Sequence, residues 1–436
     1  MGRIGFITCD EEEKKEGFPH NNFEAGVDYT CLGENIIFPA KCINNNGNEL
    51  ILGPTGSGKS LSIATPRILH TYNSSLVIPI VKRQLFDLYA PLLKNRGYTV
   101  IDLDLVHPDR SPYGYDPMSN VQSEDDMLTL ATAIVGGTSR SMDGTDDRYW
   151  SDCTAGTIAA LQGLSRYING DKSGFKDFMD LYQSLEISYP NGHCRCSLDA
   201  DFEAMETEFP RSQAPRLWRS LTGTASRTAS CVVSILNNAL SRFCGSYGDT
   251  IFAKRKIFDI KTLGLKKTAL FITTNSVSEP CKRVTNLLYA NLFKELFDEA
   301  ERHDGKLLIP VHIIADDFAA GAKIEKFADH ISVFRAAGIS CSLLLQSLSQ
   351  LNAVYGDYEA AVIRENCDSV VYFCSTDMKT CKEMAERASV PLEQVLSMRP
   401  EDIIISRRGI GVTMGKRYPV TEDEIYRSLI RTVEKE

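Results

Sequence analysis

Residues 49–60 read ELILGPTGSGKS, in which a short apolar run leads into a glycine-rich loop. Gly53, Gly58, Lys59 and Ser60 match the pattern G-x-x-x-x-G-K-[S/T], which has chemical meaning only between a strand and a helix. Both are predicted here, because ELIL is strand-like and the residues after Ser60 are helix-like. The stretch therefore predicts an α/β fold with a phosphate-binding loop, rather than a glycine-rich turn without a chemical role.

The motif assigns a role to each part of the loop. Its glycines let backbone N–H groups curl around a phosphate, and the helix that follows adds the positive end of its dipole. Lys59 would reach the β- and γ-phosphates, and Ser60 would hold Mg²⁺. ATP is favoured over GTP because the chain contains no NKxD stretch for guanine recognition. The expected nucleotide-binding residues are Gly53, Pro54, Thr55, Gly56, Ser57, Gly58, Lys59 and Ser60.

A second chemical signal lies at residues 311–317, VHIIADD, where an apolar run ends in two acids. A P-loop site needs a carboxylate at a neighbouring strand end to orient Mg²⁺, and an ATPase needs a second acid to polarise water. Adjacent side chains at a strand end point in different directions. We therefore expect Asp316 to bind the metal and Asp317 to orient the attacking water. A solvated acid pair is the alternative interpretation.

Strand-like and helix-like segments alternate at both ends of the chain. This rhythm predicts βαβ units and one parallel-rich central sheet, built from residues 48–122 and 249–436. Residues 123–248 are helix-like and predict an inserted all-α domain, with Ser123 as the N-cap of its first helix. We expect residues 1–47 to pack on the nucleotide-binding domain. The predicted strands after ELIL are SSLVIPIV (74–81), GYTVIDLDL (97–105), TALFITT (268–274), VHIIA (311–315), ISCSLLLQ (339–346) and SVVYFC (369–374).

The 436-residue chain has a formal net charge of -9, which excludes a protein that coats nucleic acid over its whole surface. Local binding stays open at clusters of basic residues, although most such clusters are solvated faces. No apolar run approaches the roughly 18 residues of a membrane-spanning helix. The thirteen cysteines form no regular framework, which favours a reducing cytosol. The clusters are 254–256, Lys282 with Arg283, Arg407 with Arg408, and Lys416 with Arg417.

Longer motifs make the chain similar to a known family from about residue 48 to about residue 419. It resembles the conjugative coupling-protein ATPases of type IV secretion, the TraG- and TraD-like family. The last of four motifs is the most specific, since the family shows an acidic pair, a helix ending in Arg, and a strand leading into LQS. The motifs are GPTGSGKS followed by Pro66, GYTVIDLDLVHPDRSPYGYDP (97–117), DDRYW (146–150) and ADDFAAGAKIEKFADHISVFRAAGISCSLLLQSLSQLNAVYG (315–356).

The resemblance implies a RecA-like motor domain with an inserted all-α domain, assembled as a hexameric ring. Such a ring would use ATP and Mg²⁺ to pass DNA, a relaxase–DNA conjugate or an effector protein to the secretion channel. Arg335 matches the arginine that reaches the ATP of the neighbouring subunit, and Gln346 matches a polar sensor of the γ-phosphate. The implied location is the cytoplasm, at the inner face of the bacterial membrane, through an N-terminal anchor that is missing from this sequence or through a membrane partner.

Two departures from the family pattern keep an alternative open. Asp317 stands where the family usually has Glu, which shortens the water-orienting side chain and predicts slower hydrolysis. SSLVIPIVKRQL (74–85) replaces an Asp-Pro-Lys-Gly-Glu motif, with only Lys82 in common. The chain could therefore be a nucleotide-gated receptor or adaptor for the relaxosome or effectors, with weak or no hydrolysis. A chromosome-partition or packaging motor on the same core is a third reading.

Overall fold

The computed structural model describes most of the chain between residues 23 and 433. Of residues 145–148 and 433 it describes only the backbone. Asp317, for which a catalytic role is expected, lies outside the described residues, as do most of residues 1–47. The described ranges are 23–24, 26–40, 45–136, 145–253, 256–275, 277–316, 318, 323–324 and 326–433.

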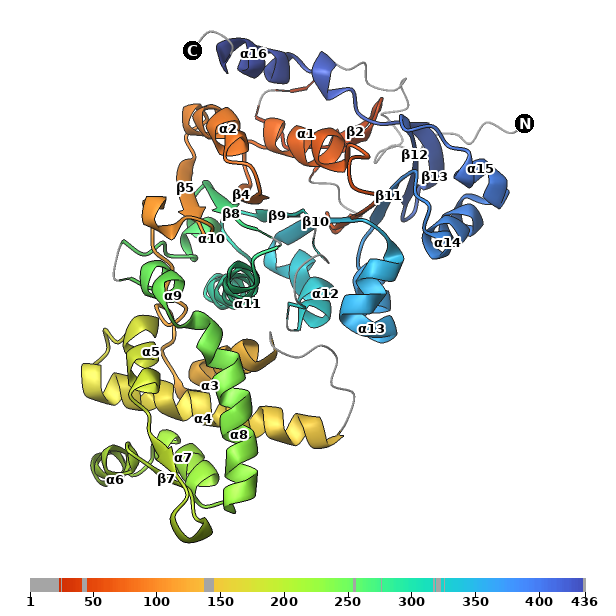
Figure 1. The fold of residues 1–436 in the computed structure, drawn as a ribbon. Helices are drawn as coiled ribbons and strands as arrows, with labels where there is room; N and C mark the ends of the chain where they lie inside the picture. Colours follow the sequence, from red (N-terminus) through yellow and green to blue (C-terminus); the bar gives the residue numbers. More distant parts are fainter. Residues whose placement is uncertain are drawn as a thin grey trace.

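A single large sheet organises the described part of the chain (Figure 1). Its nine strands follow the order β13-β12-β11-β3-β10-β9-β4-β8-β5. All neighbours from β11 to β5 pair in parallel, whereas β11–β12 and β12–β13 pair antiparallel. The strands are β3 (Glu49–Leu52), β4 (Ser75–Ile80), β5 (Thr99–Asp104), β8 (Thr268–Thr273), β9 (Val311–Ala315), β10 (Ile339–Leu345), β11 (Ser369–Phe373), β12 (Asp402–Arg407) and β13 (Gly411–Lys416).

The expectation of an α/β fold with one parallel-rich sheet from both ends of the chain is confirmed. The antiparallel pair β12–β13 was not predicted. Its second strand reads GVTMGK, is exposed or half-buried along its whole length, and therefore lacks the buried apolar run that marks a parallel strand. This hairpin extends the sheet beyond β11 and brings the C-terminal part of the chain toward the glycine-rich loop at residues 53–60.

Helices cover both faces of the sheet, and the strand pleat divides the core between them (Figure 1). Ile51 packs with one layer, which contains α1, α2 and α16, while Leu50 and Leu52 pack with the other, which contains α11, α12 and α13. The helices are α1 (Thr65–Leu69), α2 (Gln84–Asn95), α10 (Thr262–Leu265), α11 (Glu279–Glu301), α12 (Phe327–Ala337), α13 (Leu348–Glu365), α14 (Met378–Ala388), α15 (Leu392–Leu396) and α16 (Glu424–Val433). The hairpin β1 (Tyr29–Gly33) and β2 (Ile36–Pro39) also packs near α1.

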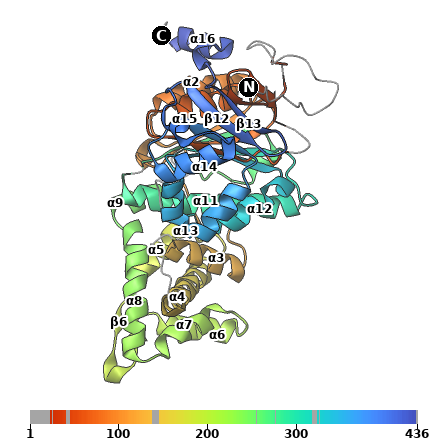
Figure 2. The same ribbon diagram turned by 90° about the vertical axis from the view of Figure 1, so that its right-hand side faces the viewer.

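The residues between β5 and α10 form a second group of helices that projects away from the sheet (Figure 2). The long helix α4 packs against α3, α5, α6, α7 and α8. A two-residue antiparallel pair, β6 with β7, interrupts the helical pattern. The elements are α3 (Glu124–Gly136), α4 (Thr145–Asn169), α5 (Phe175–Gln183), β6 (Ile187–Ser188), β7 (Arg195–Cys196), α6 (Asp199–Glu208), α7 (Ala214–Thr222), α8 (Ser226–Leu240) and α9 (Ser246–Ile251).

Polar contacts fix the start of α3 and join it to α11. Ser123 Oγ accepts the backbone N–H of Asp126 at 3.1 Å, and Asp126 Oδ2 accepts the backbone N–H of Ser123 at 2.9 Å. Lys294 on α11 lies 2.9 Å from Asp126. Burial alone would raise the pKa of Asp126, but Lys294 and the backbone donors lower it to about 2. The carboxylate is therefore charged at neutral pH and links α3 to α11, one of the helices that cover the sheet.

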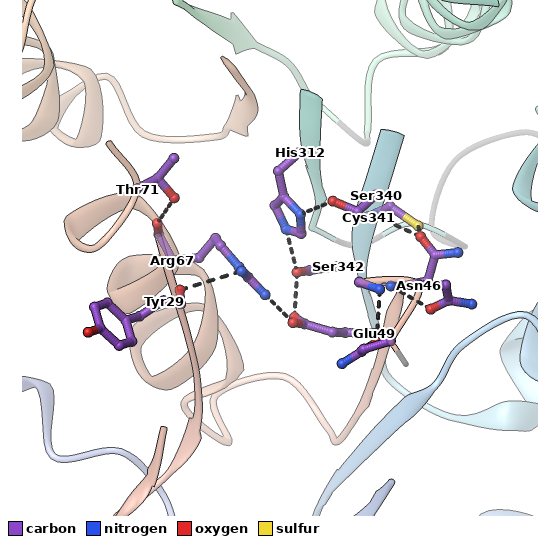
Figure 3. A network of polar contacts seen from close by, with 12 residues as sticks. Tyr29, Asn46, Glu49, Arg67, Thr71, His312, Ser340, Cys341 and Ser342 are labelled. Carbon is purple, nitrogen blue, oxygen red and sulfur yellow. Dashed lines mark hydrogen bonds and ion pairs between the residues drawn. The ribbon is translucent and has the colours of Figure 1, made fainter. Parts of the chain in front are cut away.

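A buried polar network lies at the amino ends of β3 and β9 and beside them in β10 (Figure 3). Arg67 on α1 forms an ion pair with Glu49 on β3, and Ser342 Oγ donates to Glu49 Oε2 at 2.7 Å. His312 on β9 lies 2.8 Å from both Ser342 Oγ and Ser340 Oγ. Because the Ser342 proton is used on Glu49, His312 Nε2 carries the proton and Nδ1 accepts from Ser340. Burial and the nearby Arg67 lower the pKa of His312 well below 6.5.

No helix in the described ranges is both long and apolar enough to cross a bilayer.

Candidate functional site

The glycine-rich loop leaves β3 at the carboxyl edge of the sheet and enters a π-helical turn, Ser60–Ala64, that continues as α1. Gly56 and Gly58 have φ values of 80° and 90°, which residues with a Cβ adopt only at a cost. A Cβ on Gly53 would lie 2.7 Å from Phe373 Cβ, which is closer than packing allows. Glycine is therefore required at these positions to give the loop its shape.

The Lys59 side chain folds back over the start of the loop. Its ammonium group donates to Gly53 O at 2.6 Å and to Pro54 O at 3.0 Å, and the residue is only 6 % exposed. A buried ammonium is costly unless it is paired or hydrogen-bonded. The loop carbonyls thus hold a positive charge among backbone N–H groups, in a structure suited to an anion.

Ser60 and Asp316 meet although 256 positions separate them in the sequence. Ser60 Oγ donates to Asp316 Oδ2 at 2.7 Å. Asp316 follows β9, and β10 lies between β9 and β3 in the sheet. Because the three strands are parallel, their carboxyl ends share one edge, and this brings a serine from one end of the chain to a carboxylate from the other.

The remaining predicted residues fall into two positions. Gln346 directly follows β10, and the preceding carbonyl, Leu345 O, accepts the backbone N–H of Gly53 at 3.1 Å. Gln346 is therefore at the same edge as the loop. Arg335 lies instead on the exposed side of α12, in the last turn of that helix. The position of Asp317 stays a prediction, because it lies outside the described residues.

A small cavity of about 80 Å³ lies beside Asp316, between α11 and the carboxyl ends of β4, β8 and β9. Burial, and to a smaller extent Asp316, raise the pKa of Tyr289 in its wall, so this tyrosine is neutral at physiological pH. The Nδ2 atom of Asn286 is buried there without a hydrogen-bond partner among the described residues. The cavity walls are Pro79, Val81, Thr274, Lys282, Thr285, Asn286, Tyr289, Ala315, Asp316, Phe318 and Ile324.

Several residues of the basic clusters, which are candidates for nucleic-acid contacts, instead contact other groups of the protein. Lys282 pairs with Glu279 at 3.1 Å, and Arg283 is largely buried. The Arg407 guanidinium lies 3.4 Å from the centre of the Phe38 ring. These contacts reduce what such residues can offer to a phosphate backbone.

Arg417 is a basic residue close to the loop that the sequence did not assign to the nucleotide site. Its Nη1 atom lies 2.8 Å from the position that a Cβ on Gly58 would take. In the sequence it stands out only as part of a basic cluster with Lys416. Its placement depends on the hairpin β12–β13, and a prediction of that hairpin would have been the signal needed to find it.

Comparisons with known proteins place the chain among known relatives. The family model described as "Type IV secretory system Conjugative DNA transfer" matches residues 28–390. Protein VirD4 of Agrobacterium fabrum (strain C58 / ATCC 33970) is 20 % identical over 348 residues, which are 76 % of this chain and 48 % of that protein. The chain thus spans about half the length of this relative.

Solved structures show the same fold at low sequence identity. The conjugative coupling protein TrwBdeltaN70, in its unbound monoclinic form, has a TM-score of 0.62 and 15 % identity, covering 91 % of this chain and 88 % of that one. VirB4 of Thermoanaerobacter pseudethanolicus has a TM-score of 0.53 and 12 % identity, covering 85 % and 88 %. Together with the family match over most of its length, this shows that the chain belongs to the type IV secretory system conjugative DNA transfer family.

Proposed function

We propose that this protein is an ATP-driven coupling protein that recruits DNA, a relaxase–DNA conjugate or an effector protein and pumps it toward a type IV secretion channel during conjugation. The observation that carries the proposal is the 2.7 Å hydrogen bond between Ser60 and Asp316, next to a phosphate loop with a buried lysine. This is the arrangement that a motor of this family needs for its nucleotide.

The residues at the loop fit a magnesium nucleotide. Mg²⁺ prefers oxygen ligands, and two adjacent ligands at about 2.1 Å from the ion are roughly 3 Å apart. Ser60 Oγ and Asp316 Oδ2 are separated by 2.7 Å, so small movements would let both face one ion. When bound, Mg²⁺ neutralises charge on the β- and γ-phosphates. TrwB has been solved with ADP and Mg²⁺ and with non-hydrolysable analogues of ATP and GTP, which supports the assignment.

Four further side chains have roles in this proposal. Lys59 and the loop N–H groups bind the phosphates, and Asp317 orients the attacking water. Gln346 senses the γ-phosphate from the end of β10. Arg335, exposed on α12, reaches the nucleotide of the next copy in a hexameric ring and stabilises charge on the transferred phosphoryl group.

In this proposal the cargo contacts the inserted helical domain and a few basic side chains that line the pore of the ring. Residues 123–248 are proposed as an inserted all-α domain on the cargo side, with residues 48–122 and 249–436 forming the motor. A net charge of -9 does not oppose this, because a few basic side chains repeated by ring symmetry are sufficient to line a pore.

The test is ATP hydrolysis by the purified protein with Mg²⁺, with and without single-stranded DNA. Lys59→Ala should lower turnover to background, because it removes the cation that reaches the β- and γ-phosphates. Lys94→Ala, which removes an exposed lysine from α2, is the matched control and should retain full turnover. Equal turnover in Lys59→Ala and the wild type would contradict the proposal.

A nucleotide-gated adaptor with weak hydrolysis is the second candidate, and Asp317 favours it because its side chain is shorter than the Glu usual in the family. Asp317→Glu separates the two. A slow motor should hydrolyse ATP faster with the longer side chain, whereas an adaptor should show unchanged turnover and unchanged cargo binding. Both should be measured at saturating MgATP.

A further inference from the structure

We propose that Arg417 binds the α- and β-phosphates of the nucleotide held by the loop of its own chain. This inference rests on the proposed nucleotide site and adds a phosphate ligand from outside the loop. Its starting point is the contact between the two segments, in which Arg417 Nη1 lies 2.8 Å from where a Cβ on Gly58 would stand. A side chain at position 58 would have to displace the guanidinium from this place.

The topology of the sheet explains why Arg417 reaches the loop. β13 is antiparallel to β12, which is antiparallel to β11, so β13 runs in the same direction as β3. Its carboxyl end therefore lies at the same edge as the carboxyl end of β3, where the loop begins. Arg417 is the first residue after β13. The position of Arg417 beside the loop is therefore set by the pairing of the strands in the sheet.

Contacts of Arg417 itself and of the residues that follow it hold this segment near the helix that begins at the loop. Its own N–H donates to Glu401 O at 3.0 Å. The next residue, Tyr418, is buried and donates through its hydroxyl to Asp423 at 2.7 Å. Asp423 Oδ2 also lies 2.6 Å from His70 Nε2, and His70 is the C-cap of α1. The C-terminal segment is therefore locked to the helix that the loop begins.

The guanidinium has the chemistry and freedom needed for a phosphate. Arg417 is exposed, and no ion pair or side-chain hydrogen bond engages it within the described part of the chain. A guanidinium presents a planar set of donors that matches phosphate oxygens in pairs. Backbone N–H groups of such a loop hold the α- and β-phosphates, and Gly58 is one of these residues. A cation placed against Gly58 is thus next to those phosphates and not next to the nucleoside.

Calorimetric titration of the full chain with three ligands tests this assignment. The ligands are MgADP, a magnesium complex of a non-hydrolysable ATP analogue, and magnesium pyrophosphate. Arg417→Ala should weaken all three by a similar factor, roughly 10- to 100-fold, because one charge-assisted contact is lost. Arg417→Lys should lose less, since it keeps the charge but not the paired donors. Lys416→Ala, which removes the neighbouring exposed charge, should bind all three as the wild type does.

Different results of these titrations would contradict the role of Arg417 in different ways. Affinities in Arg417→Ala within about twofold of the wild type would overturn the inference. So would a loss restricted to the ATP analogue, which would place the contact at the γ-phosphate, or a loss that spares pyrophosphate, which would place it at the nucleoside. An unchanged thermal unfolding midpoint shows that the variant is folded. If the folded wild type binds none of the ligands, the proposed function itself fails, which is a different result from a null effect of Arg417→Ala.

Discussion

Strands β3, β9 and β10 carry polar groups at both ends, and the two ends are built in opposite ways. At the amino ends, Glu49, His312 and Ser342 are buried and satisfy one another together with Arg67 (Figure 3). At the carboxyl ends the loop requires glycines with positive φ, and Ser60 is exposed to solvent. One end is closed to any ligand, whereas the other exposes Ser60 to solvent and holds the Lys59 ammonium against the loop carbonyls.

The difference separates stability from function within the same three strands. A closed network contributes to the stability of the fold only if every member remains, because a buried charge without its partner is costly. An open edge contributes little to folding and leaves its groups for a ligand, a division common at functional sites. The same chemical change, from an acid to its amide, should therefore have opposite consequences at the two ends.

Asp316→Asn is expected to have the largest effect, and on activity alone. The amide keeps the shape and can still accept from Ser60, but it lacks the charge that favours a cation. We expect ATP turnover to fall by on the order of 100-fold or more, by analogy with the loss of other preorganised charge-stabilising groups. Chemical denaturation should show a change in the free energy of unfolding below about 1 kcal/mol. Unfolding at much lower denaturant would contradict the open-edge description.

Glu49→Gln is the matching change at the closed end and should act on stability. It leaves the Arg67 guanidinium buried without a counter-charge, at a cost of roughly 3–5 kcal/mol in the free energy of unfolding. ADP affinity of the folded protein should stay within about twofold of the wild type. The double variant Glu49→Leu with Arg67→Met should recover much of the stability, since paired apolar replacements are tolerated better than a broken pair. A loss of ADP affinity in Glu49→Gln would show that the two ends are coupled.

The open end was the easier one to predict from the sequence. Phosphate chemistry demands particular residue types at fixed spacing, so the loop and the acid after β9 stand out in a single sequence. That Ser60 and Asp316 touch follows from one further step, the parallel order of the strands that carry them. The fold class could also be predicted, because buried parallel strands appear in the sequence as apolar runs.

The closed end and the C-terminal hairpin could not be predicted. Glu49 and His312 look like ordinary polar residues in the sequence, since their partners come from α1 and β10 and only the register of the strands makes them meet. Arg417 was missed for a related reason, because a half-exposed edge strand has no strong pattern of its own. Residues that act through tertiary contacts alone leave no local signal.

The closed end should also make the protein sensitive to mild acid. Burial lowers the pKa of His312 well below 6.5, so the folded state resists protonation while the unfolded state binds a proton near pH 6.5. The stability from this group is fully present above that pH and is lost as the pH falls. Between about pH 7.5 and pH 5.5 the loss should be about 1.4 kcal/mol, measured from urea unfolding curves. His312→Gln keeps a donor and an acceptor but has no titrating ring, so the free energy of unfolding should differ between the two pH values by about 1.4 kcal/mol less than in the wild type. If the pH dependence of the free energy of unfolding is unchanged in His312→Gln, then His312 is already protonated in the folded state or the network opens before His312 titrates.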